Sequence, residues 1–148
     1  DIEAILYPSF WAIYNYRKAH KLYLKGKVFR ARRISQRTAR KTGIEIHPAA
    51  QIGKGLFIDH GHGVVIGETA IIGENVTLYQ GVTLGGTGKE KGKRHPTIGN
   101  NVIVSSNTYI INEKVPDNCI VFGQSPNIVI KEKSEPEILE MTKHIWRW

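Results

Sequence analysis

The sequence predicts a mainly β protein, a parallel β-helix with a short helical segment before it and a helix after it. Three observations support this fold class. Aliphatic residues recur every six positions through the middle of the chain, glycine follows several of them, and both ends instead carry apolar residues at helical spacing. A period of six fits neither a helix nor an alternating strand, but it is the signature of hexapeptide repeats that wind into stacked coils.

The six-residue period runs from residue 46 to residue 110 with two interruptions. Its members are Ile46, Ile52, Ile58, Ile66, Ile72, Leu78, Leu84, Ile98, Val104 and Ile110. Three hexapeptides make one triangular coil, so these ten repeats predict a little over three coils. Stacked coils bury the aliphatic residues in one continuous column, which no single repeat buries alone.

Both interruptions are rich in glycine and polar residues. Between Ile58 and Ile66 the step is eight residues, and the extra residues lie in 59–63. Between Leu84 and Ile98 the step is fourteen residues, which corresponds to two repeats plus two residues. We expect this second stretch to form a loop that projects from the coils, and loops on rigid scaffolds commonly carry functional sites.

The chain divides into three parts. Residues 1–43 form an N-terminal helical segment, with one helix over about 10–26 and a second over about 27–41. Residues 44–130 form the β-helix, which closes with two ordinary strands. Residues 131–148 form a C-terminal tail.

The tail is expected to be helical. Ser134 and Glu137 form the pattern of a capping box, and apolar residues follow at helical spacing. Trp146 and Trp148 are expected to pack this helix.

Composition limits the classes of protein that the chain can represent. It has 148 residues with 41% hydrophobic residues, enough for one domain with short appendages, and no run of eighteen apolar residues that would span a membrane. The single cysteine, Cys119, excludes an internal disulfide, so we expect a cytoplasmic protein. Cys119 lies in an apolar strand, and we do not expect it to act as a nucleophile.

The net charge of +8 is concentrated at one end. Residues 1–43 hold eleven Lys and Arg and two Asp and Glu, whereas residues 44–148 hold ten and eleven. No stacking motif or zinc-finger spacing accompanies the basic segment. We therefore expect it to be a solvated or subunit-facing surface and not a nucleic-acid site.

Several segments together indicate a family. They are Gly43-Ile44-Glu45-Ile46-His47-Pro48, Phe57-Ile58-Asp59-His60-Gly61, Val65-Ile66-Gly67-Glu68-Thr69-Ala70, Gly81-Val82-Thr83-Leu84-Gly85-Gly86-Thr87 and Gly92-Lys93-Arg94-His95-Pro96. Through them the chain resembles the serine O-acetyltransferases of the hexapeptide-repeat acyltransferase superfamily. The resemblance implies a left-handed β-helix that transfers acetyl from acetyl-CoA to L-serine, giving O-acetylserine for cysteine biosynthesis, with no metal.

The reaction needs a base, because a serine hydroxyl is a weak nucleophile at neutral pH. His60 is the candidate general base, since the pKa of histidine lies near the operating pH. A carboxylate can hold the ring in one tautomer, and the resemblance implies Glu45 as this partner.

The remaining candidates bind substrate. Asp59 could neutralise the ammonium group of serine, and Arg94 and His95 could bind its carboxylate. His95 is also a catalytic candidate, because it could stabilise the tetrahedral oxyanion. Glu68 matches the family motif, and a corner carboxylate that accepts backbone N–H bonds is an equal interpretation.

The loop after Leu84 supplies the candidates for binding acetyl-CoA. Gly85, Gly86 and Thr87 could let the pantetheine arm lie against the coil, and Lys93 could attract the phosphates of CoA. The coils after Ile98 resemble those of the family less closely, because they are about one coil shorter.

Other functions remain open. Acetyltransferases that act on sugars or antibiotics share this fold and the histidine base, and an inactive or scaffold homologue is also compatible. A zinc-dependent β-helical hydratase would use three histidines, and the chain offers His47, His60, His62 and His95.

Assembly is inferred from the resemblance. It implies a homotrimer in which His60 of one chain faces His95 of another, with a hexamer as the alternative. Because the sequence ends in Trp148 and not in the isoleucine peptide that family members insert into cysteine synthase, we do not expect that partner.

Overall fold

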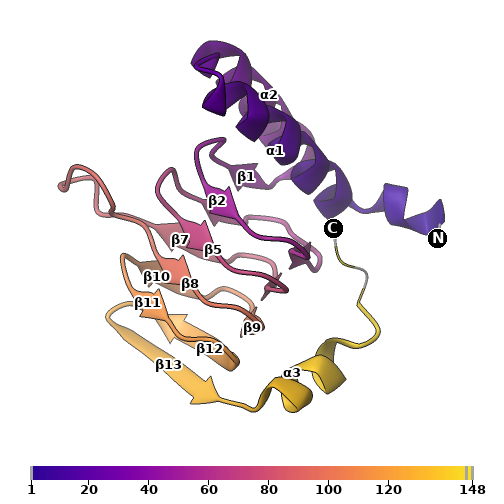
Figure 1. Ribbon diagram of the computed structural model, residues 1–148, viewed down its shortest axis with the longest axis vertical. Helices are drawn as coiled ribbons and strands as arrows, with labels where there is room; N and C mark the ends of the chain where they lie inside the picture. The colour runs from indigo at the N-terminus through magenta and orange to yellow at the C-terminus, as the bar shows by residue number, and fades with distance from the viewer. Residues whose placement is uncertain (1, 146, 148) are drawn as a thin grey trace.

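The computed structural model describes residues 2–145 and 147 of the chain. The 3-10 helix η1 (Ile2–Leu6) and the helices α1 (Pro8–Leu24) and α2 (Val28–Thr42) precede the β-helix, and α3 (Glu135–Thr142) follows it. The strands are β1 (Glu45–Ile46), β2 (Gln51–Ile52), β3 (Phe57–Ile58), β4 (Val65–Ile66), β5 (Ile71–Ile72), β6 (Thr77–Leu78), β7 (Thr83–Gly85), β8 (Thr97–Ile98), β9 (Val102–Val104), β10 (Tyr109–Ile111), β11 (Lys114–Val115), β12 (Cys119–Gln124) and β13 (Asn127–Glu132). Figure 1 shows α1 and α2 lying across one end of the stacked strands, with β13 and α3 at the other end.

The stacked strands form three faces. Each strand pairs in parallel with the strand three places along the chain, so β1-β4-β7-β10 form the first face, β2-β5-β8-β11 the second and β3-β6-β9-β12 the third. The register keeps the inward residues in line, because Ile46, Ile66, Leu84 and Ile110 are successive partners on the first face. The period of six is therefore one face of a triangular coil, as predicted.

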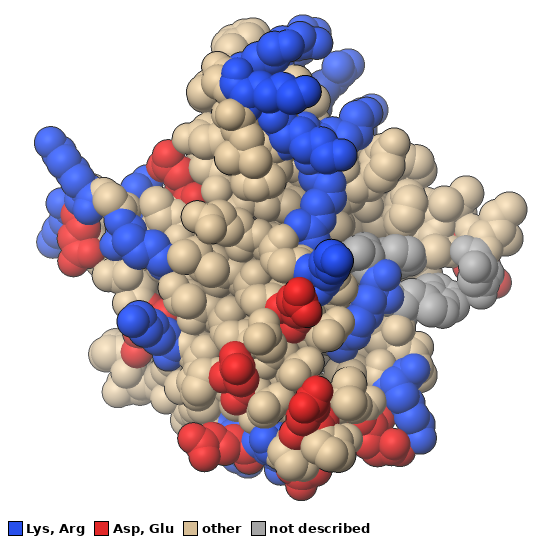
Figure 2. All heavy atoms as spheres, viewed as in Figure 1, with Lys and Arg blue, Asp and Glu red and all other residues tan. Residues whose placement is uncertain are grey.

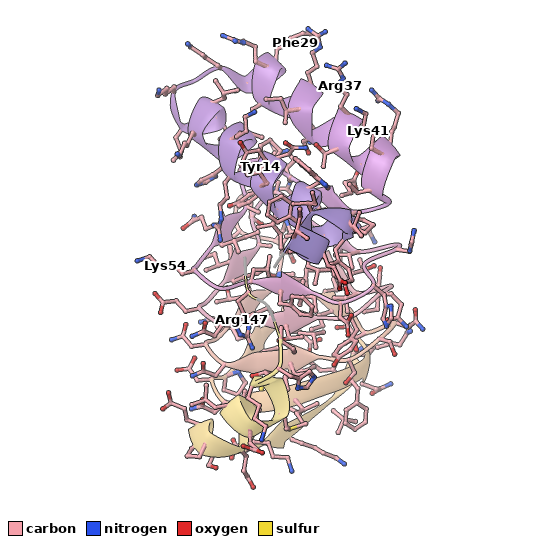
Figure 3. All side chains as sticks on the ribbon, turned by 90° about the vertical axis from the view of Figure 1, so that its right-hand side faces the viewer. Tyr14, Phe29, Arg37, Lys41, Lys54 and Arg147 are labelled. Carbon is pink, nitrogen blue, oxygen red and sulfur yellow. The ribbon has the colours of Figure 1, made fainter. Side chains whose placement is uncertain are left out.

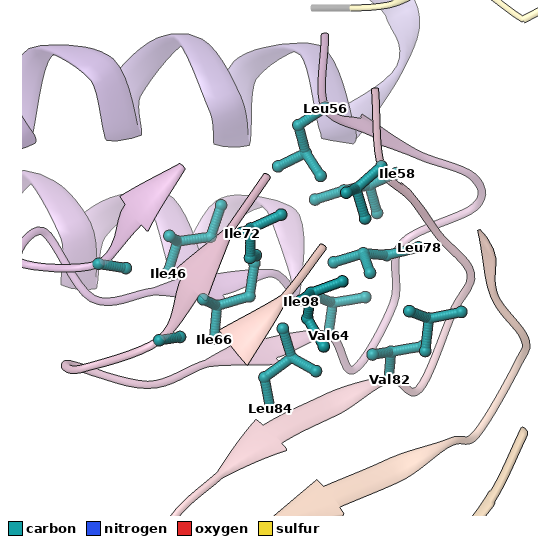
Figure 4. Close-up of a cluster of buried hydrophobic side chains, with 14 of the residues drawn as sticks. Ile46, Leu56, Ile58, Val64, Ile66, Ile72, Leu78, Val82, Leu84 and Ile98 are labelled. Carbon is teal, nitrogen blue, oxygen red and sulfur yellow. The ribbon is translucent and has the colours of Figure 1, made fainter. Parts of the chain in front are cut away.

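The aliphatic column forms the core. All of its predicted members are buried except Ile52, which is half-buried (Figure 4). The column continues through Val115 and Val121, both buried, so the strands complete four coils and the prediction of a little over three was wrong. The step from Ile110 to Val115 is only five residues, which ended the visible period too early.

The fourteen-residue step also differs from its prediction. β7 lies on the first face and β8, the next strand, lies on the second. The step from Leu84 to Ile98 is therefore one repeat with eight additional residues, and not two repeats plus two. The additional residues form the expected loop, which projects from the coils in Figure 1.

The helical hairpin of α1 and α2 caps the first coil. Backbone hydrogen bonds between coils run in both directions, as in the bonds from Gln51 N to Ala70 O (3.0 Å) and from Asn75 N to Lys54 O (2.8 Å). The first coil pairs with another coil on one side only, and on its other side five of its carbonyl groups accept from side chains of the hairpin. The donors are Ser35 Oγ to Ile46 O (2.6 Å), His20 Nδ1 to Pro48 O (2.7 Å), Tyr16 Oη to Ala50 O, Arg17 Nη1 to Ile52 O (2.5 Å) and Arg17 Nη2 to Gly53 O (2.6 Å).

Two of these donors are held in the right protonation state. Burial raises the pKa of Tyr16 to about 12, so its hydroxyl keeps the proton that it donates. His20 meets a carbonyl oxygen, so Nδ1 carries the ring proton. The hairpin thus satisfies a row of backbone acceptors that would otherwise be buried without partners.

The other end of the β-helix is closed by β13 and α3. β13 pairs antiparallel with β12 over its whole length, from Gln124↔Asn127 to Cys119↔Glu132. The predicted capping box is confirmed, because Ser134 Oγ accepts from Glu137 N and Glu137 Oε2 accepts from Ser134 N. Trp146 and Trp148 lie outside the described residues.

Arg147 connects the tail to the coils. Its guanidinium donates to Gly55 O (3.0 Å) and to Thr77 Oγ1 (3.3 Å), at the corner and strand that lie between the tail and the hairpin (Figure 3). The tail thus packs back along the side of the β-helix and does not extend away from it.

Charge is distributed unevenly over the surface. Lys and Arg gather over α1 and α2 at the top of Figure 2, and neither helix contains an acidic residue. Figure 3 shows Phe29 and Lys41 projecting from α2 away from the coils. Among the described residues, no helix is long and apolar enough to cross a membrane.

We predict that Arg17→Ala lowers the free energy of unfolding by about 2 kcal/mol, because two carbonyl groups of the first coil lose a charged donor. Arg33→Ala is the matched control, since Arg33 is exposed on α2 and the same side-chain atoms are removed. Equilibrium denaturation in guanidinium at one protein concentration measures both variants. Equal losses for the two variants would contradict the capping role of Arg17.

Candidate active site

The first insertion forms the corner between the third and first faces. β3 ends at Ile58 and β4 begins at Val65, so the corner takes residues 59–64, two more than the corner 79–82 of the next coil. The insertion folds back on the start of the first coil, where Gly63 N donates to Gly43 O (2.9 Å). A Cβ at Gly61 would lie 2.6 Å from the Ile44 side chain, so glycine is required for this close approach.

His60 has an unusual backbone conformation. Its φ is 61°, and the other non-glycine residues with positive φ in the described part of the chain are all asparagine. Asparagine adopts the left-handed region readily, whereas histidine adopts it less often. The corner therefore imposes this conformation on His60, which is typical of residues held for a function.

The His60 corner presents an imidazole and two carboxylates to solvent. The His60 side chain is 71% exposed, and its Nε2 lies 3.9 Å from Asp59 Oδ1. Glu45 is exposed on β1, directly after Ile44, the residue on which the insertion packs. Among the described residues, no hydrogen bond or ion pair joins Glu45 to His60.

His95 lies at the corner between the first and second faces. Its ring covers Gly67, where a Cβ would lie only 1.9 Å from Cδ2 of His95. His95 Nδ1 accepts from Thr69 N (3.1 Å) and lies 2.8 Å from Thr69 Oγ1. The ring therefore packs on Gly67 and bonds to Thr69, both in the preceding coil.

Arg94 is fixed at the same corner. Its Nη2 donates to Glu68 Oε2 (2.5 Å), and this hydrogen bond is the main cause that lowers the pKa of Glu68. Burial, followed by the charges of Arg94 and Lys93, lowers the pKa of His95. At neutral pH the corner thus holds an ionised Glu68, a cationic Arg94 and a neutral His95.

His47 belongs to this corner as well, although the sequence analysis considered it only for zinc. His47 comes directly after β1, at the position that Gly67 takes after β4 and Gly85 takes at the end of β7. Because paired strands keep this register from coil to coil, the spacing in the sequence could have placed His47 at this corner. Its Nδ1 accepts from Ala49 N (3.0 Å), and its ring meets the edge of Tyr23. Burial, followed by the charge of Arg32, lowers the pKa of His47.

The two groups of candidates lie at opposite edges of the first face. The His60 corner leads into this face and the His95 corner leads out of it. Gly67 comes four positions after Gly63, a span of roughly 13 Å at about 3.3 Å per residue. The two corners are therefore separated by the width of the first face within one chain.

The sequence was compared with known proteins. No protein-family model matches it. The serine acetyltransferase of Staphylococcus epidermidis is 59% identical over 120 residues, which cover 80% of this chain and 56% of that protein. A match of this length in a 148-residue chain necessarily includes the central coils and both corners.

The chain is a homologue of the serine acetyltransferases. It spans only about half the length of the curated relatives it matches, 56% in the case of the Staphylococcus epidermidis protein. 

Solved serine acetyltransferases share the fold. The hexapeptide-repeat serine O-acetyltransferase of Brucella melitensis has a TM-score of 0.76 at 34% identity, covering 90% of this chain and 61% of that one. The soybean enzyme in complex with serine has a TM-score of 0.78 at 36% identity, covering 86% and 60%. The Brucella abortus enzyme in complex with coenzyme A has a TM-score of 0.79 at 36% identity, covering 89% and 60%. With the three stacked faces, this likeness confirms a left-handed parallel β-helix of hexapeptide repeats.

In this serine acetyltransferase homologue the candidates for CoA binding lie along the loop after β7. Gly85 ends β7, and Gly86 packs so closely on the Arg94 backbone that a Cβ would lie 2.6 Å from Arg94 O. Thr87 is exposed. Lys93 Nζ donates to His95 O, so this lysine also holds the base of the loop.

The structure gives little support to Cys119 as a nucleophile or to a zinc site. Cys119 is buried, and burial raises its pKa to about 11, so its thiol is a poor nucleophile at neutral pH. Within residues 2–145 and 147, no group of three His, Cys, Asp or Glu side chains converges on a metal position.

We predict that Gly67→Ala lowers the free energy of unfolding by about 1–3 kcal/mol, because the new methyl group overlaps the His95 ring. The same change in a His95→Ala background should cost far less, since the overlapping ring is gone. Equilibrium denaturation of the four proteins gives the coupling energy. Equal costs in both backgrounds would show that the ring of His95 does not lie over Gly67.

Proposed function

We propose that this chain carries the catalytic β-helix of a serine O-acetyltransferase, which transfers the acetyl group of acetyl-CoA to the hydroxyl of L-serine. The observation that carries the proposal is the 59% identity to a serine acetyltransferase over a stretch that includes both corners. Related enzymes solved with serine and with coenzyme A support the choice of the two substrates.

His60 is the proposed general base. It takes the proton of the serine hydroxyl as the oxygen attacks the thioester carbonyl, and the collapse of the tetrahedral intermediate expels the CoA thiolate, which regains that proton. Direct attack needs no acyl-enzyme, in keeping with the buried thiol of Cys119. Glu45 is the proposed orienting carboxylate, and it would need to approach the His60 ring when substrate is bound.

Serine is proposed to bind through its charged groups. Asp59 pairs with the ammonium group, and Arg94 with the carboxylate, in an arrangement prepared by the Arg94–Glu68 contact (2.5 Å). His95 donates a hydrogen bond to the carboxylate or to the oxyanion that forms in the transition state. Gly85, Gly86, Thr87 and Lys93 are proposed to line the path of the pantetheine arm.

The site is proposed to form between subunits of a homotrimer. This proposal rests on the separation of the two corners across the first face, roughly 13 Å in one chain. A neighbouring chain placed along that face could bring its His95 corner to the His60 corner of the first chain. His60 is exposed in a single chain, as expected for a residue that lies at the interface between two subunits, which we call the subunit seam.

A steady-state assay with acetyl-CoA and L-serine tests the function. We expect acetylation of L-serine, with galactosides and chloramphenicol inactive as acceptors.

His60→Ala should bind CoA yet lose turnover by a factor of about 100 or more, because the base is gone. Arg94→Ala should raise the KM for serine and leave the KM for acetyl-CoA unchanged. A wild-type chain that acetylates another acceptor faster than serine would refute the proposal.

The subunit seam has its own test. His60→Ala and His95→Ala chains should each be nearly inactive alone, whereas random mixed trimers should recover about one quarter of the wild-type activity, because about one seam in four joins the two intact histidines. Co-expression with two affinity tags provides the mixed trimers, and each variant mixed with itself is the control. Absence of recovery would mean that the site lies within one chain.

A further inference from the structure

Thr69 makes an unusual set of contacts with the base of the loop. Its Oγ1 accepts a hydrogen bond from Arg94 N (2.9 Å) and another from His95 N (3.0 Å). The same oxygen lies 2.8 Å from His95 Nδ1. The Thr69 backbone N–H also points at His95 Nδ1, at 3.1 Å.

These contacts determine which nitrogen of His95 carries the proton. A hydroxyl oxygen has two acceptor positions and one hydrogen. Both acceptor positions of Thr69 Oγ1 are taken by backbone N–H groups, so its hydrogen is what faces His95 Nδ1. Because the Thr69 N–H is a donor as well, Nδ1 must be an acceptor, and the ring proton resides on Nε2.

We propose that Thr69 is a positioning residue that holds His95 as the neutral Nε2–H tautomer and so makes it a hydrogen-bond donor to substrate. This inference rests on the proposed function and extends it, because nothing in the reaction scheme otherwise prevents His95 from acting as a second base. With Nδ1 occupied by two donors and Nε2 protonated, the neutral ring has no free lone pair with which to take a proton from serine.

The surrounding charges act in the same direction. The groups that face His95 are Arg94 and Lys93 on the loop, Glu68 on the preceding corner and His47 on the first coil. Burial and the two cations lower the pKa of His95, while Glu68 opposes them. A second proton would have to bind at Nδ1 against two donors, so the ring stays neutral to a lower pH than an ordinary histidine.

The tautomer can be measured directly. In the intact chain labelled with 15N in its histidine rings, long-range proton–nitrogen spectra at about pH 8 distinguish Nδ1–H from Nε2–H, because the two nitrogens differ in chemical shift when only one is protonated. His95→Gln identifies the signals of His95 by their loss. We expect an unprotonated Nδ1 and a protonated Nε2 in the wild type.

Two variants test the role of the hydroxyl. Thr69→Ser keeps it and should keep the tautomer, whereas Thr69→Val has the same shape and leaves only the backbone N–H of residue 69 on Nδ1, so a measurable share of the Nδ1–H tautomer of His95 should appear. Thermal unfolding of the two variants checks that both fold. A wild-type spectrum with Nδ1–H, or a Thr69→Val spectrum identical to the wild type, would overturn the inference.

Kinetic measurements test the role of Thr69 independently of the spectra. Thr69→Val should lower kcat/KM for serine about tenfold, as expected for a hydrogen bond of about 1–1.5 kcal/mol made to the transition state, with the KM for acetyl-CoA unchanged. Thr69→Ser should restore the rate to within about threefold of wild type. If the wild type fails to acetylate serine, the proposed function is wrong, but the spectra still decide the role of Thr69.

Discussion

The fold depends on how the open side of its first coil is covered. In a parallel β-helix each coil shares backbone hydrogen bonds with the coil on either side, as between Gln51 N and Ala70 O and between Asn75 N and Lys54 O. The first coil has such a neighbour on one side only, so carbonyl groups on its other side, among them those of Ile46, Ala50 and Ile52, need other donors. Buried acceptors without partners cost about 1–3 kcal/mol each, so a covering element must bring donors with it.

The helical hairpin meets this requirement with long polar side chains. Tyr16 and Arg17 on α1, together with Ser35 on α2, reach carbonyl groups on different sides of the first coil. Helices alone offer no free backbone donors along their length, so the side chains must supply them. This explains why part of the basic composition of residues 1–43 is structural, while the exposed remainder covers the outer side of the hairpin in Figure 2.

The same coil geometry determines where chemistry can be placed. The aliphatic column tolerates no insertion within a strand, because an extra residue would turn every following side chain to the wrong face. Insertions are therefore confined to corners, and the two that occur lie at opposite edges of the first face, at 59–63 and after Gly85. Each rests on the adjacent coil, one through Gly61 on Ile44 and the other through His95 on Gly67.

Much of this arrangement could be predicted from the sequence. The period of six is a direct consequence of the column, and the two breaks in the period mark His60 and the Arg94-His95 pair. The number of coils could not be read, because the five-residue step to Val115 hides the last coil. The hairpin contacts and the hydrogen bonds between Thr69 and His95 could not be predicted either. Thr69 and His95 are 26 residues apart in sequence, and their contact can be inferred only once the register of the coils is known.

The loop and the His60 insertion are held by different coils of the β-helix. Arg94 and His95 are fixed by residues 67–69 of the second coil, and the His60 insertion is fixed by residues 43–44 of the first. The groups proposed to bind serine thus depend on the coils nearest the hairpin. The segment proposed to bind acetyl-CoA contacts the fourth coil instead. Glu90 Oε2 in the loop accepts a hydrogen bond from Asn112 Nδ2 (3.1 Å), and Gly85 at the end of β7 packs against the Ile111 side chain. A change in the fourth coil should therefore affect the proposed binding of acetyl-CoA more than that of serine.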